Sequence, residues 1–217
     1  MAYQMQVLIE NFGYLLIGAV ETLKITSIAV LMGLFIGTFV GMGRLAKSRV
    51  LSYPSSVYVE FLRGTPLLVQ IFLIYYGLPS LGLNLKAFPA AVIALGINSG
   101  AYVAEIVRAG IQSVAKGQYE AARSLGMTHS QAMRYVILPQ AFRNILPALG
   151  NEFIALLKDS SLVSVIGITE LMKSGQIVIS RTFASFSIYG GVALIYFGMT
   201  FTLSRIVRYA EKRMAIS

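Results

Sequence analysis

The chain has 217 residues, of which 56% are hydrophobic and only 12% are charged, whereas a typical soluble domain has roughly 25% charged residues. This composition is typical of a membrane protein. The absence of cysteine excludes disulfides, cysteine zinc sites and thiol nucleophiles, and the single histidine, His129, cannot build a multi-histidine metal site. The excess of 18 basic over 9 acidic residues matters through its distribution in a membrane protein, so it does not indicate nucleic acid as a partner.

Charge-free stretches predict about five membrane spans. Four uncharged windows, 25–43, 64–85, 87–104 and 182–204, approach or exceed the roughly 18 to 20 residues that cross a hydrocarbon core as a helix. A fifth apolar segment, 144–169, contains Glu152, Lys158 and Asp159. We therefore predict an all-α integral membrane protein with one domain, 1–217, and spans at about 14–43, 57–80, 87–110, 144–169 and 186–206. Because no basic residue precedes Lys24, we expect the first span to be retained and not cleaved as a signal peptide.

The basic residues predict the side of the membrane on which each connection lies. One set of alternating connections has 12 basic residues and the other has three. The first set comprises Arg44, Lys47, Arg49, Arg108, Lys116, Arg123, Arg134, Arg143, Arg205, Arg208, Lys212 and Arg213, and the second comprises Lys86, Lys173 and Arg181. Because cytoplasmic loops are enriched in Lys and Arg, we expect the N-terminus outside, the C-terminus in the cytoplasm, and the loop at about 113–140 on the cytoplasmic side.

Small residues in the first span predict a close contact between helices. Gly33, Gly37 and Gly41 recur at every fourth position and therefore lie on one helix face. A face without side chains lets a neighbouring backbone approach closely in a membrane. We expect this face to pack against another span.

The long cytoplasmic loop has the signals of two short helices. We expect Glu120 in the first turn of one helix, where an anion is favourable, and Gly126 at its left-handed C-terminal cap. Thr128 and Gln131 have the spacing of a capping box for a second helix, which Pro139 is expected to end. By themselves, these signals favour an ordinary interfacial loop.

The spacing of residues in this loop resembles a motif of known transporters. Glu120-Ala121-Ala122, then Gly126, then 136–139 (VILP) have the spacing of the EAA loop in permease subunits of ATP-binding-cassette (ABC) importers. The family prefers Ile where this chain has Val136, which is a conservative difference. Segments 61–70 (FLRGTPLLVQ), 97–105 (INSGAYVAE) and 158–162 (KDSSL) resemble signatures of the polar amino acid branch of that family.

The resemblance implies a type I, MetI-like importer fold in a bacterial inner membrane. It implies a permease dimer, formed with a second copy or a homologous permease, together with two cytoplasmic ATPase subunits and an extracytoplasmic solute-binding protein. The residues expected to form the coupling helix that contacts an ATPase are Glu120, Ala121, Ala122 and Gly126. The chain has no G-x-x-x-x-G-K-[ST] motif, so we expect ATP and Mg²⁺ to be bound by the ATPase, and no cofactor, catalytic residue or metal site in this chain.

Two intramembrane carboxylates are candidates for substrate binding. Glu152 and Asp159 are seven residues apart, which is about 700° of helix rotation, so they share one face. In one interpretation, Lys158 and Asp159 pair with other buried charges and hold the dimer together. In the other, which we prefer, Glu152 and Asp159 bind the ammonium groups of an amino acid, and two carboxylates favour a basic substrate (arginine, lysine or histidine). A neutral or acidic polar amino acid such as glutamine is the alternative.

A break in the second span supplies further candidates. Thr65 and Pro66 have the order of an N-cap and a first helical residue, so a restarted helix and Arg63 are expected to bind the α-carboxylate of a substrate. The alternative, to which we give equal weight, is that Pro66 merely kinks a helix and Arg63 extends to the lipid headgroups. Asn98 is expected to reach the substrate from the third span. Glu105 is expected to pair with Arg108 near the cytoplasmic end.

Other functions fit the sequence less well. An ion-driven carrier or channel would use the intramembrane carboxylates as proton or ion sites, but the coupling motif argues against it. An intramembrane hydrolase would need His129 beside Ser160 or Ser161, and His129 lies in the cytoplasmic loop. The sequence therefore predicts a transporter subunit, not an enzyme.

Overall fold

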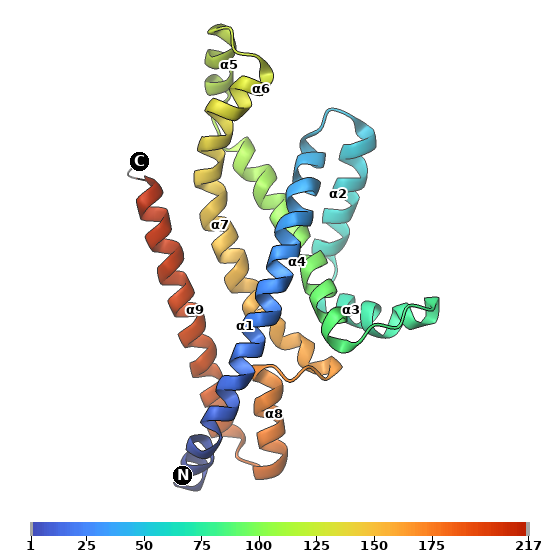
Figure 1. Ribbon diagram of the computed structural model, residues 1–217, viewed down its shortest axis with the longest axis vertical. Helices are drawn as coiled ribbons and strands as arrows, with labels where there is room; N and C mark the ends of the chain where they lie inside the picture. The colour runs from blue at the N-terminus through green and yellow to red at the C-terminus, as the bar shows by residue number, and fades with distance from the viewer. Residues whose placement is uncertain (1, 216–217) are drawn as a thin grey trace.

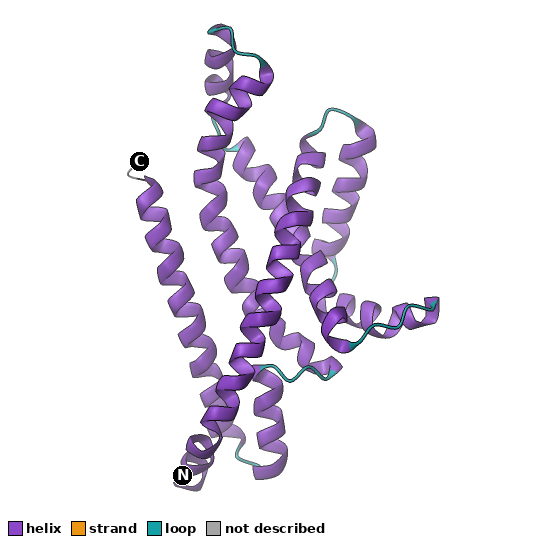
Figure 2. Cartoon of the chain, viewed as in Figure 1, coloured by secondary structure: helices purple, strands orange, loops and turns teal. Residues whose placement is uncertain are grey.

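The structure is a computed structural model, and it describes residues 2–215. This part of the chain is helical throughout, with short connections and no strand (Figure 2). The α-helices are α1 (Ala2–Leu45), α2 (Arg49–Gly64), α3 (Leu67–Phe72), α4 (Ala87–Gln112), α5 (Lys116–Ser124), α6 (His129–Ala132), α7 (Leu138–Asp159), α8 (Leu171–Thr182) and α9 (Ser185–Ala215). Shorter helical turns are η1 (Leu73–Gly77), η2 (Leu78–Leu81), η3 (Met133–Ile137) and η4 (Ser160–Ile166).

The described residues contain three straight helices long and apolar enough to cross a membrane, and up to five spans if each bent pair counts as one. The three are Tyr3–Leu45, Ala87–Gln112 and Ser185–Met214. In Ala87–Gln112, 72% of the apolar window is buried, against 17% in Ser185–Met214. Helix α4 therefore lies at the centre of the bundle, whereas α9 exposes a large apolar surface.

The second predicted span is bent by 106° between Arg49–Gly64 and Leu67–Leu81. Thr65 and Pro66 adopt extended backbone angles between the two helices, because proline lacks an N–H and disfavours helical geometry in the residue before it. The predicted helix positions of these two residues, an N-cap and a first helical residue, were wrong. Thr65 is the C-cap of α2, and Pro66 takes the N-cap position of α3, so that Leu67 is the first helical residue.

The segment predicted as the fourth span is divided in the structure. Helix α7 ends at Asp159, and a 3-10 turn, Ser160–Ile166, follows it. After a bend of 48°, the chain continues as α8, a helix that the sequence analysis did not anticipate. Asp159 therefore lies at a helix end and not in the middle of a long span.

The glycine face of α1 packs against α4, as predicted. A Cβ atom placed on Gly37 would lie 2.5 Å from the Val103 Cβ and 2.6 Å from the Gly100 carbonyl oxygen. One placed on Gly41 would lie 2.8 Å from the Ala104 carbonyl oxygen. Only glycine permits this approach, and it brings α1 close to the polar residues of α4.

The two ends of the molecule differ in the segments they contain (Figure 1). The α5–α6 hairpin, the connection between α1 and α2, and the C-terminal end of α9 lie toward one end. The N-terminus and α8 lie toward the opposite end. The segments rich in basic residues are thus gathered at the same end as the hairpin.

Candidate functional site

The α5–α6 hairpin has the predicted glycine cap. Gly126 has a φ of +83°, its N–H donates to the Arg123 carbonyl at 3.1 Å, and the Met127 N–H donates to the Ala122 carbonyl at 3.2 Å. These two bonds form a Schellman motif, which needs a left-handed residue after the helix. The prediction for Gly126 is confirmed.

The second helix of the hairpin begins as predicted but does not end as predicted. The Thr128 N–H donates to the Gln131 Oε1 at 2.8 Å and the Gln131 N–H donates to the Thr128 hydroxyl at 3.3 Å, which completes the capping box. Pro139, however, lies in the first turn of α7. The π turn Met133–Ile137 immediately precedes α7, and such wider turns accommodate local strain in a helix. The chain therefore continues from the hairpin into the membrane without a break.

The residues of the predicted coupling motif differ in their exposure to solvent. Ala122 is buried, whereas Glu120 and Ala121 are exposed. Glu120 was expected in the first helical turn, which was wrong, because α5 already begins at Lys116. Leu125, at the tip, is 82% exposed.

Glu152 faces α4 from α7. The Ser99 hydroxyl donates to the Glu152 Oε1 at 3.0 Å. Within residues 2–215, no ion pair of 4 Å or less involves Glu152, Lys158 or Asp159, so the expected pairing of Lys158 and Asp159 with other charges is not seen in this chain alone. Arg63 and Asp159 lie close enough to act electrostatically on Glu152. The two carboxylates are therefore available to a cationic partner.

A buried amide bridges the bend after α2 to the central helix. The Gln70 Nε2 donates to the Thr65 hydroxyl at 2.9 Å and to the Leu62 carbonyl at 2.8 Å. The Gln70 Oε1 accepts from the Asn98 Nδ2 at 2.9 Å. Asn98 is next to Ser99 in the chain, so α4 joins this bridge to Glu152. The sequence analysis named Thr65 and Asn98 but missed Gln70, although a Gln within an otherwise apolar segment was a visible signal.

Glu105 is surrounded by arginines from three helices. Arg108 of α4 and Arg44 of α1 both donate to its carboxylate, and the Arg63 guanidinium of α2 lies 3.8 Å away. The predicted pair of Glu105 with Arg108 is confirmed. The contributions of Arg44 and Arg63 could not be found from the sequence, because these residues are distant along the chain.

Glu170 forms a second polar centre that the sequence analysis missed. It is fully buried and caps α8 by accepting the N–H groups of Met172 at 2.9 Å and Lys173 at 2.8 Å. The Tyr196 hydroxyl of α9 also donates to it, at 2.9 Å, and the Thr22 hydroxyl of α1 lies 3.4 Å away. Glu170 thus ties three helices together at the end opposite the hairpin.

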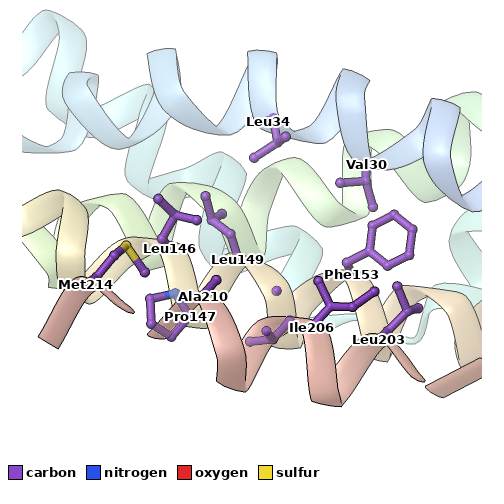
Figure 3. A pocket seen from close by; sticks show the side chains of 12 residues that line it. Val30, Leu34, Leu146, Pro147, Leu149, Phe153, Leu203, Ile206, Ala210 and Met214 are labelled. Atoms are coloured by element: carbon purple, nitrogen blue, oxygen red, sulfur yellow. The ribbon is translucent and has the colours of Figure 1, made fainter. Parts of the chain in front are cut away.

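The cavity between α1, α7 and α9 has no polar chemistry (Figure 3). It measures about 330 Å³, and the close-up shows Val30 and Leu34 of α1 above Phe153 and other apolar side chains. A polar solute would lose its hydration there without gaining hydrogen bonds. The polar candidate site is therefore the group around Glu152. Among the described residues, no group of three or more His, Asp or Glu side chains is placed to hold a metal ion.

Comparison with known proteins identifies the family. Residues 29–216 match the family described as "Binding-protein-dependent transport system inner membrane component". The chain belongs to this family. It is 43% identical over 96% of both chains to the probable glutamine ABC transporter permease protein GlnM of Bacillus subtilis, and 42% identical over 92% of both chains to the glutamine transport system permease protein GlnP of Escherichia coli.

Solved structures agree with this assignment. A crystal structure described as an amino acid ABC transporter with histidines has a TM-score of 0.92 and 51% identity, covering 95% of this chain and 96% of the other. An inward-facing MetNI methionine ABC transporter chain has a TM-score of 0.71 at 23% identity, which shows the fold alone. The resemblance to permeases and the predicted all-α MetI-like fold are thus confirmed. The chain is a multi-pass inner-membrane permease subunit of an ABC importer, a class of subunit that is not itself an enzyme.

Proposed function

We propose that the chain forms the translocation path of an ATP-driven importer of polar amino acids. The observation that carries this proposal is Glu152, an intramembrane carboxylate that has a hydroxyl partner but, among residues 2–215, no cation within ion-pair distance. Placing a charge in a membrane costs about 2.5 to 3.5 kcal/mol on insertion scales, so such a group needs a functional explanation. The names of the relatives support it, since they include glutamine and, at 42% identity, the L-cystine permease TcyB of Bacillus subtilis.

Glu152 binds the α-ammonium group that all these substrates share. Asp159, two helical turns away, sets the side-chain preference. When Asp159 is free it accepts a second cationic group, which favours arginine, lysine or histidine. When the neighbouring Lys158 neutralises it, the site suits a neutral amino acid such as glutamine. The glutamine relatives support the neutral substrate. The solved structure described as having histidines supports the basic one.

Thr65 and Asn98 form the wall of this site through Gln70. Their polar groups are already bonded to the Gln70 amide, which holds the bend after α2 against α4. We assign them to the shape of the cavity. The α3 segment beyond the bend completes the same wall.

The hairpin couples transport to ATP hydrolysis. Glu120, Ala121, Ala122 and Gly126 lie on a short, rigid element at the basic end of the molecule, and this element contacts a cytoplasmic ATPase subunit. The assembly has two such ATPases, which bind ATP and Mg²⁺, a second copy of this chain or a homologous permease, and an extracytoplasmic solute-binding protein.

Reconstitution tests this function. The complete complex in liposomes should take up labelled L-glutamine or L-arginine only with ATP and binding protein. Glu152→Gln should weaken uptake of both about 10- to 100-fold, since hydrogen bonds to charged groups contribute about 1.5 to 3 kcal/mol. Asp159→Asn should reduce uptake of arginine more than of glutamine.

Glu10→Gln, at an exposed carboxylate of α1, is the matched control, and membrane abundance is measured for each variant. Uptake without ATP would instead indicate an ion-driven carrier. Unchanged uptake in both carboxylate variants would remove Glu152 and Asp159 from the site.

The orientation is tested separately. Because the basic segments lie at the hairpin end, a reporter fused to the C-terminus should be cytoplasmic, and a cysteine replacing Ser80 should be labelled from outside. The opposite labelling pattern would place the hairpin beyond the reach of an ATPase.

A further inference from the structure

Two carboxylates near the candidate site, Glu105 and Glu152, differ in the number of arginines beside them. Glu105 has three arginines within 4 Å, and Arg44 and Arg108 both donate to it. The third, Arg63, is the loosest, at 3.8 Å, with 41% of its side chain exposed. In the described part of the chain, no cation lies within that distance of Glu152. Glu105 therefore keeps two arginine partners if Arg63 moves away.

Arg63 lies between the two carboxylates along α4. Its guanidinium is 5.3 Å from the centre of the Tyr102 ring. Tyr102 is three residues from Glu105 in one direction and three from Ser99, the hydroxyl partner of Glu152, in the other. Each step is a rise of roughly 4.5 Å, which a long, flexible arginine side chain covers by changing rotamer.

A cation beside Glu152 would lower the cost of this carboxylate in the membrane when no substrate ammonium group lies there. An unpaired carboxylate is unfavourable in the membrane, and the importer returns to its starting state without an amino acid. Arg63 precedes the bend at Gly64–Pro66, so its backbone adjoins the point where α2 ends. Movement of this segment would carry the guanidinium along α4.

We propose that Arg63 is the exchangeable counter-ion of Glu152. In this structure it lies beside Glu105; it moves to Glu152 at the stage of the cycle after the substrate's ammonium group has left, and it returns to Glu105 when a new ammonium group takes its place. This proposal rests on the proposed function, because it requires that Glu152 bind the substrate. Arg63 then competes with the substrate and does not bind its α-carboxylate.

Binding of L-glutamine and L-arginine to the purified complex in lipid nanodiscs tests the competition. Arg63→Gln should bind both about 10-fold more tightly, because the competing charge is lost, and its maximal uptake rate should fall, because the empty site is no longer neutralised. Arg63→Lys should restore both values toward those of the unmodified protein. Arg49→Gln, at an exposed arginine of the same helix, α2, is the matched control. It removes a positive charge from α2 but leaves Arg63 and its partners in place, so no tightening is expected.

Two results would overturn the exchange. Weaker binding in Arg63→Gln would mean that Arg63 contacts the substrate directly. Unchanged binding would mean that Arg63 neither contacts the substrate nor competes with it for Glu152. If Glu152→Gln also leaves binding unchanged, the proposed substrate site fails. If binding is unchanged only in the Arg63 variants, the proposed substrate site is retained and the exchange alone is rejected.

A double-mutant cycle keeps the proposal testable if Arg63→Gln is poorly folded in isolation. Thermal unfolding of the complex is compared for Arg63→Gln, Glu152→Gln and the double variant. Coupling between the two residues should be present without amino acid and lost at saturating amino acid. An absence of coupling in the empty complex would contradict the exchange.

Discussion

The α5–α6 hairpin and the polar contacts between the membrane helices are specified in different ways. The glycine-cap and capping-box bonds of the hairpin join residues at most five positions apart, such as Met127 to Ala122. The contacts around Glu152 join Gln70 to Asn98 and Ser99 to Glu152, which are 28 and 53 positions apart. A local motif is therefore readable in the chain, whereas a contact between helices depends on how the bundle packs. Changes between helices should destabilise the whole protein, and changes in the hairpin should act on coupling.

The largest effect is expected at Glu170, the buried group between α1, α8 and α9. Glu170→Ala leaves the N–H groups of Met172 and Lys173 and the Tyr196 hydroxyl without their partner. The free energy of unfolding should fall by about 1.5 to 3 kcal/mol, the range for hydrogen bonds to a charged group, as measured by chemical unfolding in detergent. Glu21→Ala, at a partly exposed carboxylate that pairs with Lys24, should change it by less than about 0.5 kcal/mol. Equal effects would remove the distinction between buried and exposed carboxylates.

A comparable but smaller loss is expected where α1 meets α4. Gly37→Ala would place a methyl group 2.5 Å from the Val103 Cβ, and overpacking of this kind costs about 1 to 3 kcal/mol. Gly198→Ala, in α9, has no heavy atom within 4 Å of the new methyl group and should be neutral or slightly stabilising. The same unfolding measurement on both variants checks this. A stable Gly37→Ala protein would show that α1 and α4 can separate.

In the hairpin, Gly126→Leu should uncouple the transporter without unfolding it. A left-handed conformation costs a non-glycine residue about 1 to 2 kcal/mol, and Gly126 has a φ of +83°. Uptake and binding-protein-stimulated ATPase activity should fall together by about 10-fold, while the unfolding midpoint of the membrane helices stays unchanged. Glu120→Lys should act in the same direction through the exposed surface of α5.

Gly117→Leu is the matched control for Gly126→Leu. Gly117 lies within α5, and a Cβ atom there meets no heavy atom within 4 Å. Normal coupling in Gly126→Leu would contradict the assignment of the hairpin as the coupling element. A lower unfolding midpoint would contradict its independence from the helix bundle.

The smallest effect is expected at the capping box. Thr128→Ala removes the acceptor of the Gln131 N–H, which costs about 1 kcal/mol at a typical N-cap. Hydrogen exchange of the amides in α6 should become about five- to ten-fold faster, with α4 unchanged. Ser130→Ala, an exposed neighbour, should leave exchange in α6 within about two-fold. Faster exchange throughout the chain would mean that the hairpin and the membrane helices unfold together.

Some errors of sequence interpretation have one physical origin. Pro139 was expected to end a helix, but a proline in the first helical turn needs no N–H partner, and the preceding π turn lets the chain continue into α7. Glu105 was paired correctly with Arg108, three positions away, while its bond to Arg44, 61 positions away, was missed. In both cases the local interpretation was incomplete because the neighbouring turn or helix was unknown.

The sequence by itself determined the membrane class, the glycine face of α1, the Gly126 cap and the capping box at Thr128. These depend on composition or on residues within one or two helical turns, and backbone geometry makes such spacings meaningful before any tertiary structure exists. Only the tertiary structure decided that Arg49–Gly64 and Leu67–Leu81 meet at 106°, and that Gln70 joins this bend to α4. It also decided that Arg63 lies beside Glu105, while no cation among the described residues pairs with Glu152. The positions of these charges depend on which helices pack together. Apolar composition does not specify those neighbours, because spans of similar composition are equally compatible with the lipid whichever helices they contact.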